Sequence, residues 1–113
     1  MELQYSELNN GIRSIKLIGK LDADGFNQVD LKFTAHCAGD NIRVVVDISG
    51  VTFLASIGIR MLIMNARSLA TRNGKIALLK PNSDVLNVLE MTGIPAIIPV
   101  YSSQESAETI LLS

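Results

Sequence analysis

The chain has 113 residues, of which 48% are hydrophobic, and a formal net charge of −1. This length and composition predict one globular domain with a real core and exclude an intrinsically disordered chain. The near-neutral charge, with basic residues scattered singly, excludes the electrostatic footprint of a protein that binds nucleic acid or an acidic membrane surface.

Three further features of the sequence bear on location. Cys37 is the only cysteine, which excludes an internal disulfide and suits a reducing cytoplasm. The first ten residues hold no basic segment followed by an apolar one, so we expect no signal peptide. Charged residues interrupt the apolar stretch 42–64, which we therefore assign to a core and not to a membrane span. A cytoplasmic protein is the resulting expectation.

The first half of the chain predicts a hairpin, a helix and a buried strand. Alternating segments at 2–8 and 12–19 flank the turn sequence NNG, as in a β-hairpin. An amphipathic helix follows, with Asp22 or Asp24 as its N-cap. The β-branched run IRVVVDIS at 42–49 is typical of a central strand buried on both faces. The apolar positions of the helix are Phe26, Val29, Phe33 and Cys37, and Gly39 follows its end.

The second half alternates helices with short strands. A helix is predicted from Ser56 to about residue 72, and a strand at 75–80. A helix follows at 82–93, with Asn82 or Ser83 as its cap and Gly93 as its stop, then a strand at 97–100 and a helix at 102–112. The predicted buried positions of the first of these helices are Ile59, Leu62, Ile63, Ala66, Leu69 and Ala70.

The resulting order, β-β-α-β-α-β-α-β-α, indicates the α/β class. We expect a single domain over residues 1–113, a sandwich with a mixed sheet of four to five strands and about four helices.

Ser56, in the sequence FLASIGIRML, lies between a buried run and a helix, and a nucleophile is one role to test. A hydrolase elbow requires Gly-x-Ser-x-Gly. Gly58 fits the last position, but Leu54 replaces the first glycine, and the only histidine, His36, precedes the serine. We therefore expect no hydrolase and, with no intact phosphate-binding loop in the chain, no enzyme. His36 and Cys37 are adjacent on a helix and cannot share a metal, so no metal or cofactor is expected.

Two roles for Ser56 stay open on the residues alone. Serine is a favoured N-cap, and the helical pattern begins directly after it. The end of a strand followed by a helix N-terminus is also where α/β folds place functional sites, and a phosphate there meets free backbone N–H groups.

The segment VVVDISGVTFLASIGIRML resembles the signature of the STAS-domain anti-sigma factor antagonist family, in which a strand ending in Asp-Leu/Ile-Ser is followed by Asp-Ser-Ser/Thr/Ala-Gly-Leu at a helix start. The likeness continues through RNGKIALLKPNSDVLNVLEMTGIPAIIPVY, and LIGKLDA is similar to the family's Gly-Glu-Leu-Asp segment. Because these pieces follow one another in order over nearly the whole chain, the resemblance implies a STAS-like fold.

The resemblance also implies a function. Family members in the unphosphorylated form bind an anti-sigma factor, which is a serine kinase of GHKL type, and a PP2C-type phosphatase reverses the phosphorylation that ends binding. By position, Ser56 corresponds to the phosphorylated serine and Asp22 to the acidic residue of a nearby loop. The partner-binding residues so implied are Asp22, Ala55, Ile57, Gly58, Ile59 and Arg60. We expect a monomer when the protein is free, and no nucleic acid or membrane partner.

Three positions depart from the family pattern. Ala55 stands where an aspartate usually precedes the serine, Ile57 replaces a small residue, and Arg60 stands where a small residue is common. Arg60 lies one helical turn after Ser56, within reach of a phosphate there. The alternative function is a scaffold or a ligand- or nucleotide-sensing module of the same fold, in which Ser56 is only a helix cap.

Overall fold

A mixed five-stranded sheet forms the centre of the fold, and the computed structural model describes all residues from 1 to 113. The strands follow one another across the sheet in chain order. β1 (Glu2–Glu7) and β2 (Arg13–Leu21) form the predicted antiparallel hairpin. β3 (Arg43–Leu54), β4 (Lys75–Leu79) and β5 (Val100–Tyr101) each run parallel to the strand before them. The α/β class, the order of the elements along the chain and a sheet of four to five strands are therefore as predicted.

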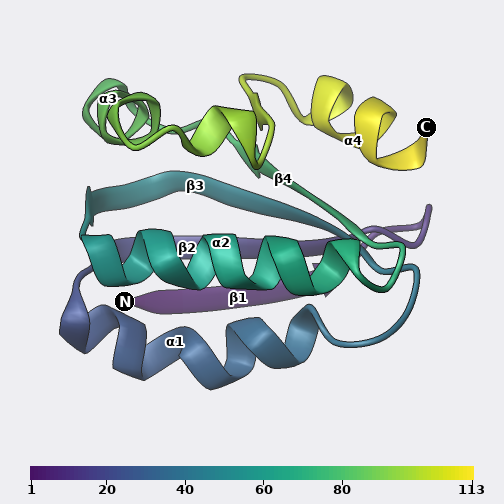
Figure 1. Cartoon of the computed structure of the whole chain (residues 1–113), viewed down its shortest axis with the longest axis horizontal. Helices are drawn as coiled ribbons and strands as arrows, with labels where there is room; N and C mark the ends of the chain where they lie inside the picture. Colours follow the sequence, from purple (N-terminus) through teal and green to yellow (C-terminus); the bar gives the residue numbers. More distant parts are fainter.

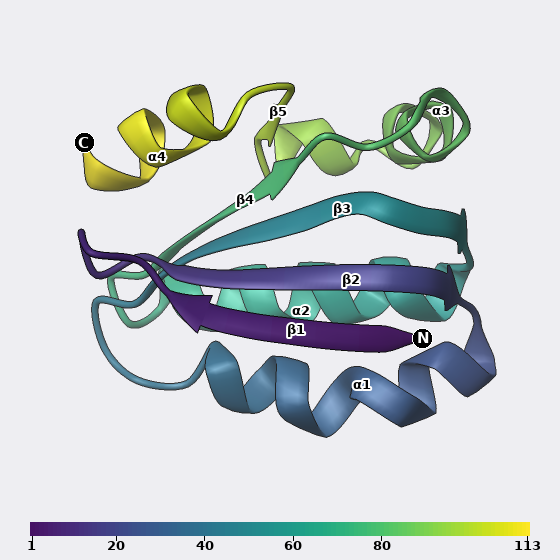
Figure 2. The same ribbon diagram turned by 180° about the vertical axis from the view of Figure 1, so that it is seen from behind.

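The helices cover the two faces of the sheet unequally. α1 (Ala23–His36), α2 (Ser56–Ala70) and α3 (Ser83–Met91), with the 3₁₀ turn η1 (Ile94–Ala96), pack on one face, whereas α4 (Gln104–Leu112) packs on the other (Figure 1). Figure 2 shows that no helix covers the second face of β1 and β2. None of the helices combines the length and the apolar character needed to cross a membrane.

β3 contributes to both hydrophobic cores, as its sequence predicts. Val44 and Val46 lie in the larger core, under the three helices, and Val45 lies in the smaller one, under α4. All three are fully buried. The uninterrupted β-branched run therefore marks a central strand whose two faces both exclude water.

Two strands differ from the prediction by more than two residues at one end. β3 continues to Leu54, five residues beyond the predicted end, and it stays paired with β2 past Gly50 across two register shifts, at each of which β3 has one extra residue. The last strand forms at Val100–Tyr101 and not at 97–100. Gly93, with φ of 76°, turns the chain into η1, and Pro99 has no N–H to donate to a strand ladder.

The buried face of α2 is rotated from the predicted one. Ile59 and Ile63 are half-buried and Ala70 is exposed, whereas Met61 and Asn65 are buried. Asn65 is the one buried polar residue of the chain, and its amide Nδ2 donates to the Met61 carbonyl at 2.9 Å. A buried Asn interrupts the apolar pattern, which is why periodicity alone selects the neighbouring stripe.

Two arginines bind the C-terminal end of α1. Arg13 Nη1 donates to the carbonyls of residues 36 and 38 at 2.8 and 3.0 Å. Arg72 donates to the carbonyl of residue 39 from Nε at 2.8 Å and to that of residue 37 from Nη2 at 3.0 Å. Together they satisfy four successive carbonyls at the negative end of the helix dipole. We call this arrangement the arginine clamp.

The two residues at the end of α1 that first suggest chemistry have structural roles. His36 stacks on Tyr5 of β1 with ring centroids 3.8 Å apart, and burial, with Arg13 nearby, lowers its pKa. Burial raises the pKa of the Cys37 thiol to about 12, so the sulfur remains a neutral core atom.

Candidate functional site

The residues singled out by the sequence meet where β2 and β3 end. The two strands are parallel neighbours, Leu21 pairs with Leu54, and the Ala55 N–H donates to the Leu21 carbonyl at 3.0 Å. The turn that carries Asp22 therefore lies beside the turn that carries Ser56, and α1 and α2 begin at the same end of the sheet (Figure 1). This is the carboxyl edge, where parallel sheets place their sites.

Asp22 is the N-cap of α1, one of the two positions that the sequence allows. Its backbone is extended, and its carboxylate accepts a hydrogen bond from the Gly25 N–H at 2.8 Å. The side chain is half-buried. Capping uses one carboxylate oxygen and leaves the other available for a second contact.

The prediction that Ser56 caps α2 is wrong. Ala55 occupies the N-cap position, with φ of −88° and ψ of 167°, and no side chain there accepts a hydrogen bond. Because β3 continues to Leu54, only one residue is left to link strand and helix, and Ser56 becomes the first helical residue. Its hydroxyl is exposed and has no capping role.

The start of α2 is unlike the starts of the other three α-helices. Those have an Asp, Asn or Ser cap that accepts from a backbone N–H, and an acidic residue in the first turn. α2 has neither. The first amides of a helix have no partner within it, so the positive end of α2 is compensated by no side chain of its own.

The six predicted partner residues divide by exposure. Arg60 is exposed, and Asp22, Ala55 and Ile57 are half-buried. Gly58 is buried, and Ile59 is half-buried against the core. These last two residues therefore fix the position of α2 beneath the surface.

Gly58 allows α2 to approach the sheet closely. A Cβ at this position would lie 2.5 Å from Cγ of Leu21 and 3.1 Å from Cδ1 of Leu54, both of which are buried. A larger residue would therefore push the start of the helix, and Ser56 with it, away from the strand ends.

Two hollows share Ile57 and Arg60 in their lining, and the smaller one adjoins Ser56. A small one of about 160 Å³ is lined by Ser56, Ile57 and Arg60. A longer groove of about 410 Å³ lies between α1 and α2, and Ile57 and Arg60 line it too. Its other lining residues are Phe26, Asp30, Thr34, Met61, Met64, Asn65 and Ser68.

The sequence analysis missed this groove. The signal was present at residues 57, 61 and 64, which helical spacing places on one apolar stripe at the margin of the buried face. Met61 is buried and Met64 is 63% exposed, so the stripe runs from the core to the surface.

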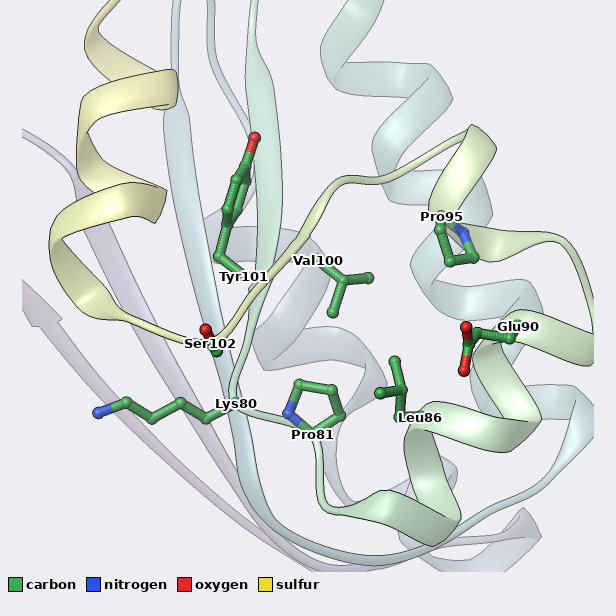
Figure 3. Close-up of a pocket in the computed structure, with 8 residues that line it drawn as sticks. All are labelled: Lys80, Pro81, Leu86, Glu90, Pro95, Val100, Tyr101 and Ser102. Carbon is green, nitrogen blue, oxygen red and sulfur yellow. The ribbon is translucent and has the colours of Figure 1, made fainter.

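The largest hollow in the molecule, about 570 Å³, lies elsewhere, at the ends of β4 and β5. Half of its eight lining residues are Pro81, Leu86, Pro95 and Val100. Figure 3 shows the Lys80 side chain extending away from it while the Glu90 carboxylate lies at its other side. With a carboxylate and no inward cation, this hollow is poorly suited to the phosphates of a nucleotide.

Comparison with known proteins identifies the family to which this fold belongs. The family model of the STAS domain matches residues 6–107. The chain belongs to the STAS domain family. A curated relative from Bordetella bronchiseptica, the anti-sigma factor antagonist BtrV, is 28% identical over 91 residues, which cover 80% of this chain and 78% of BtrV.

Solved STAS structures share the whole fold. An anti-sigma factor antagonist (STAS) domain protein from Planctomyces limnophilus has a TM-score of 0.86 and 21% identity, with 98% of each chain covered. SpoIIAA, a Bacillus cell fate determinant solved in the phosphorylated form, has a TM-score of 0.72 and 18% identity over 96% of this chain and 99% of SpoIIAA. Both therefore have the fold of this STAS domain.

Proposed function

We propose that this STAS domain is an anti-sigma factor antagonist whose binding is switched by phosphorylation of Ser56. The observation that carries the proposal is the start of α2: Ser56 is exposed, and neither it nor any neighbour caps the helix. Helix capping therefore does not explain why a serine occupies this position. The Ser56 hydroxyl is accessible to a partner. The solved phosphorylated form of a protein with this fold supports a phosphate-based switch.

The proposed cycle involves two enzymes and no catalysis by this chain. An anti-sigma factor that is a GHKL-type kinase would transfer the γ-phosphoryl group of ATP to Ser56 Oγ. The new O–P bond forms as the bond to ADP breaks, and a base of the kinase takes the hydroxyl proton. A PP2C-type phosphatase would direct water to the phosphorus and release inorganic phosphate. We further propose that the cycle is cytoplasmic and that the free protein is a monomer.

The physical effect of the phosphate falls on the partner and not on the fold. Phosphorylation adds about −1.5 to −2 charges at a helix N-terminus, where negative charge is stabilising. The fold should therefore persist. A partner packed on the same surface would have to desolvate the dianion, which weakens the complex.

We propose that Asp22, Ala55, Ile57 and Arg60 form the partner surface around Ser56. They surround the two adjacent turns, and each has exposed or partly exposed atoms. Gly58 and Ile59 would contribute indirectly, by fixing the start of α2.

The test compares Ser56→Asp with Ser83→Asp in binding to the purified anti-sigma factor of the source organism. Ser83 is the first residue of α3, as Ser56 is of α2, and it is also exposed. The two variants therefore place the same charge at the same helical position. Ser56→Asp should weaken binding by more than about tenfold, and Ser83→Asp should leave it unchanged. Equally tight binding by both variants would contradict the switch.

Mass spectrometry of the protein isolated from its native cells supplies the second test. A phosphate on Ser56 supports the switch. Its absence under all growth conditions would favour the alternative, a scaffold or ligand-sensing module of the same fold.

A further inference from the structure

Ser56 and Arg60 lie on the same side of α2. They are four residues apart, which is one helical turn, and both are exposed. Ile57 completes the lining of the small hollow between them, about 160 Å³ in volume. The exposed arginine and the proposed modification site thus adjoin the same space.

The direction of helical side chains brings the guanidinium toward Ser56. The Cα–Cβ bond of a helical residue tilts toward the N-terminus, so a side chain covers the turn that precedes it. For Arg60, the preceding turn is the one that contains Ser56. Arginine also presents paired N–H donors in a planar fork that matches two phosphate oxygens.

No acidic side chain lines this hollow; Asp30 lines the groove between α1 and α2, to which Arg60 also contributes. The first turn of α2 contains no Asp or Glu, and the cap position holds Ala55. The first turns of the other three α-helices contain Asp24, Asp84 and Glu105. Arg60 is therefore the one charged side chain that lines the hollow.

We propose that Arg60 binds the phosphate group of phosphorylated Ser56, so that this chain carries its own counter-ion for the modification. The proposal rests on the proposed function, because it presumes a phosphate on Ser56. Arg60 also lines the groove between α1 and α2, opposite Asp30. When the guanidinium turns to the phosphate, the groove loses its cation, and the modification changes the partner surface beyond Ser56 itself.

The experiment measures the second pKa of the phosphate by ³¹P NMR. Phosphoserine is incorporated at position 56 during translation, so no kinase is needed, and the chemical shift is followed from pH 4 to 8. Wild type is compared with Arg60→Gln, Arg60→Lys and Arg67→Gln. Arg67 is the matched control, because it is exposed on the same helix but lies in its last turn. Circular dichroism checks that each variant is folded.

A neighbouring cation favours the phosphate dianion and lowers its pKa. Arg60→Gln should therefore raise this pKa by about 0.2–0.7 units, which corresponds to an exposed ion pair. The pKa difference between wild type and Arg60→Gln should shrink in 1 M salt. Arg60→Lys keeps a cation at this position, so its phosphate pKa should lie between those of wild type and Arg60→Gln. Arg67→Gln should leave the phosphate pKa close to that of wild type. Identical curves for wild type and Arg60→Gln, or an equal shift in Arg67→Gln, would overturn the proposal.

This result is independent of the switch itself. Because the phosphate is installed directly, the titration gives the same answer whether or not cells phosphorylate Ser56. Identical titration curves would remove the role of Arg60 and leave the proposed function intact. Conversely, absence of phosphate in native cells would remove the switch without altering the measured pairing.

Discussion

Replacing Ala55 with aspartate should stabilise the protein. Ala55 already has the extended backbone of an N-cap residue, but its methyl side chain has no oxygen to accept from the open amides of α2. An aspartate at this position requires no backbone change. Its carboxylate can accept from the second amide of the helix, whereas the third, the Gly58 N–H, already donates to the Ala55 carbonyl at 3.0 Å.

The expected gain in stability can be estimated from the usual effect of an N-cap residue. Exchange between a good cap and alanine is worth about 1 kcal/mol in the free energy of unfolding, within a range of about 0.5–2 kcal/mol. A chain of 113 residues has an unfolding entropy of about 240 cal/mol/K near its midpoint, so 1 kcal/mol corresponds to about 4 °C in Tm. Ala55→Asp should therefore raise Tm by about 2–8 °C.

Thermal and urea unfolding followed by circular dichroism measure the change. Ala55→Asn separates the two contributions, because it supplies the cap oxygen without the charge and should give most of the gain at any salt concentration. Asp22→Ala removes a cap that the structure does contain and should cost about 1 kcal/mol. Ser56→Ala should leave the free energy of unfolding within about 0.5 kcal/mol of wild type.

Two results would refute this reasoning. One is an unchanged Tm for Ala55→Asp alongside a lowered Tm for Asp22→Ala, which would mean that the amides at the start of α2 are not open. The other is a loss of about 1 kcal/mol in Ser56→Ala, which would make the serine the cap after all.

Two further predictions concern packing and pH. Gly58→Ala should cost about 1 kcal/mol in urea unfolding, because a clash with buried Leu21 exceeds the gain in helix propensity; a more stable variant would show that the contact is not tight. His36 has a lowered pKa in the folded protein, so the unfolded chain binds more protons and stability should fall as pH drops below 6.5, the usual value. His36→Phe keeps an aromatic ring on Tyr5. In this variant the midpoint of urea unfolding should depend less on pH between pH 7.5 and 5.5 than in wild type. If the urea midpoint changes equally with pH in both proteins, the group that titrates is not His36.

The features that local sequence fixes were predicted well. The positions of the helices in the chain and the β-branched run at 42–49 each depend on residues within one turn or one strand, as do the caps, for which Asp22 and Asn82 were each one of two candidates. The order of the elements follows directly from them. The family resemblance then indicated the place of the site, and the structure brings the turns of Asp22 and Ser56 together there.

The features that depend on pairing between distant segments were not predicted. β3 continues past Gly50 by pairing with β2 across two register shifts, and this extension is what moves the N-cap from Ser56 to Ala55. No local pattern at residues 49–54 carries that information. The groove was missed for a related reason, since it exists only where α1 lies against α2.

The arginine clamp has a consequence for the dynamics of the site at the opposite end of α1. Arg72 follows α2 in the chain, and its guanidinium binds the carbonyls of residues 37 and 39 beyond the end of α1. The two helices are thus joined at their C-terminal ends by the clamp and at their N-terminal ends by the paired ends of β2 and β3. A helix of fourteen residues such as α1 is marginal by itself in water, so separating it from α2 exposes carbonyls and apolar surface that it cannot satisfy alone.

We therefore expect α1 and α2 to open as one cooperative unit, so that their amides share a common opening free energy in hydrogen exchange. A charge added at the first residue of α2 would act on that shared equilibrium, and its effect would be measurable in the protection of α1, the helix that does not carry the charge.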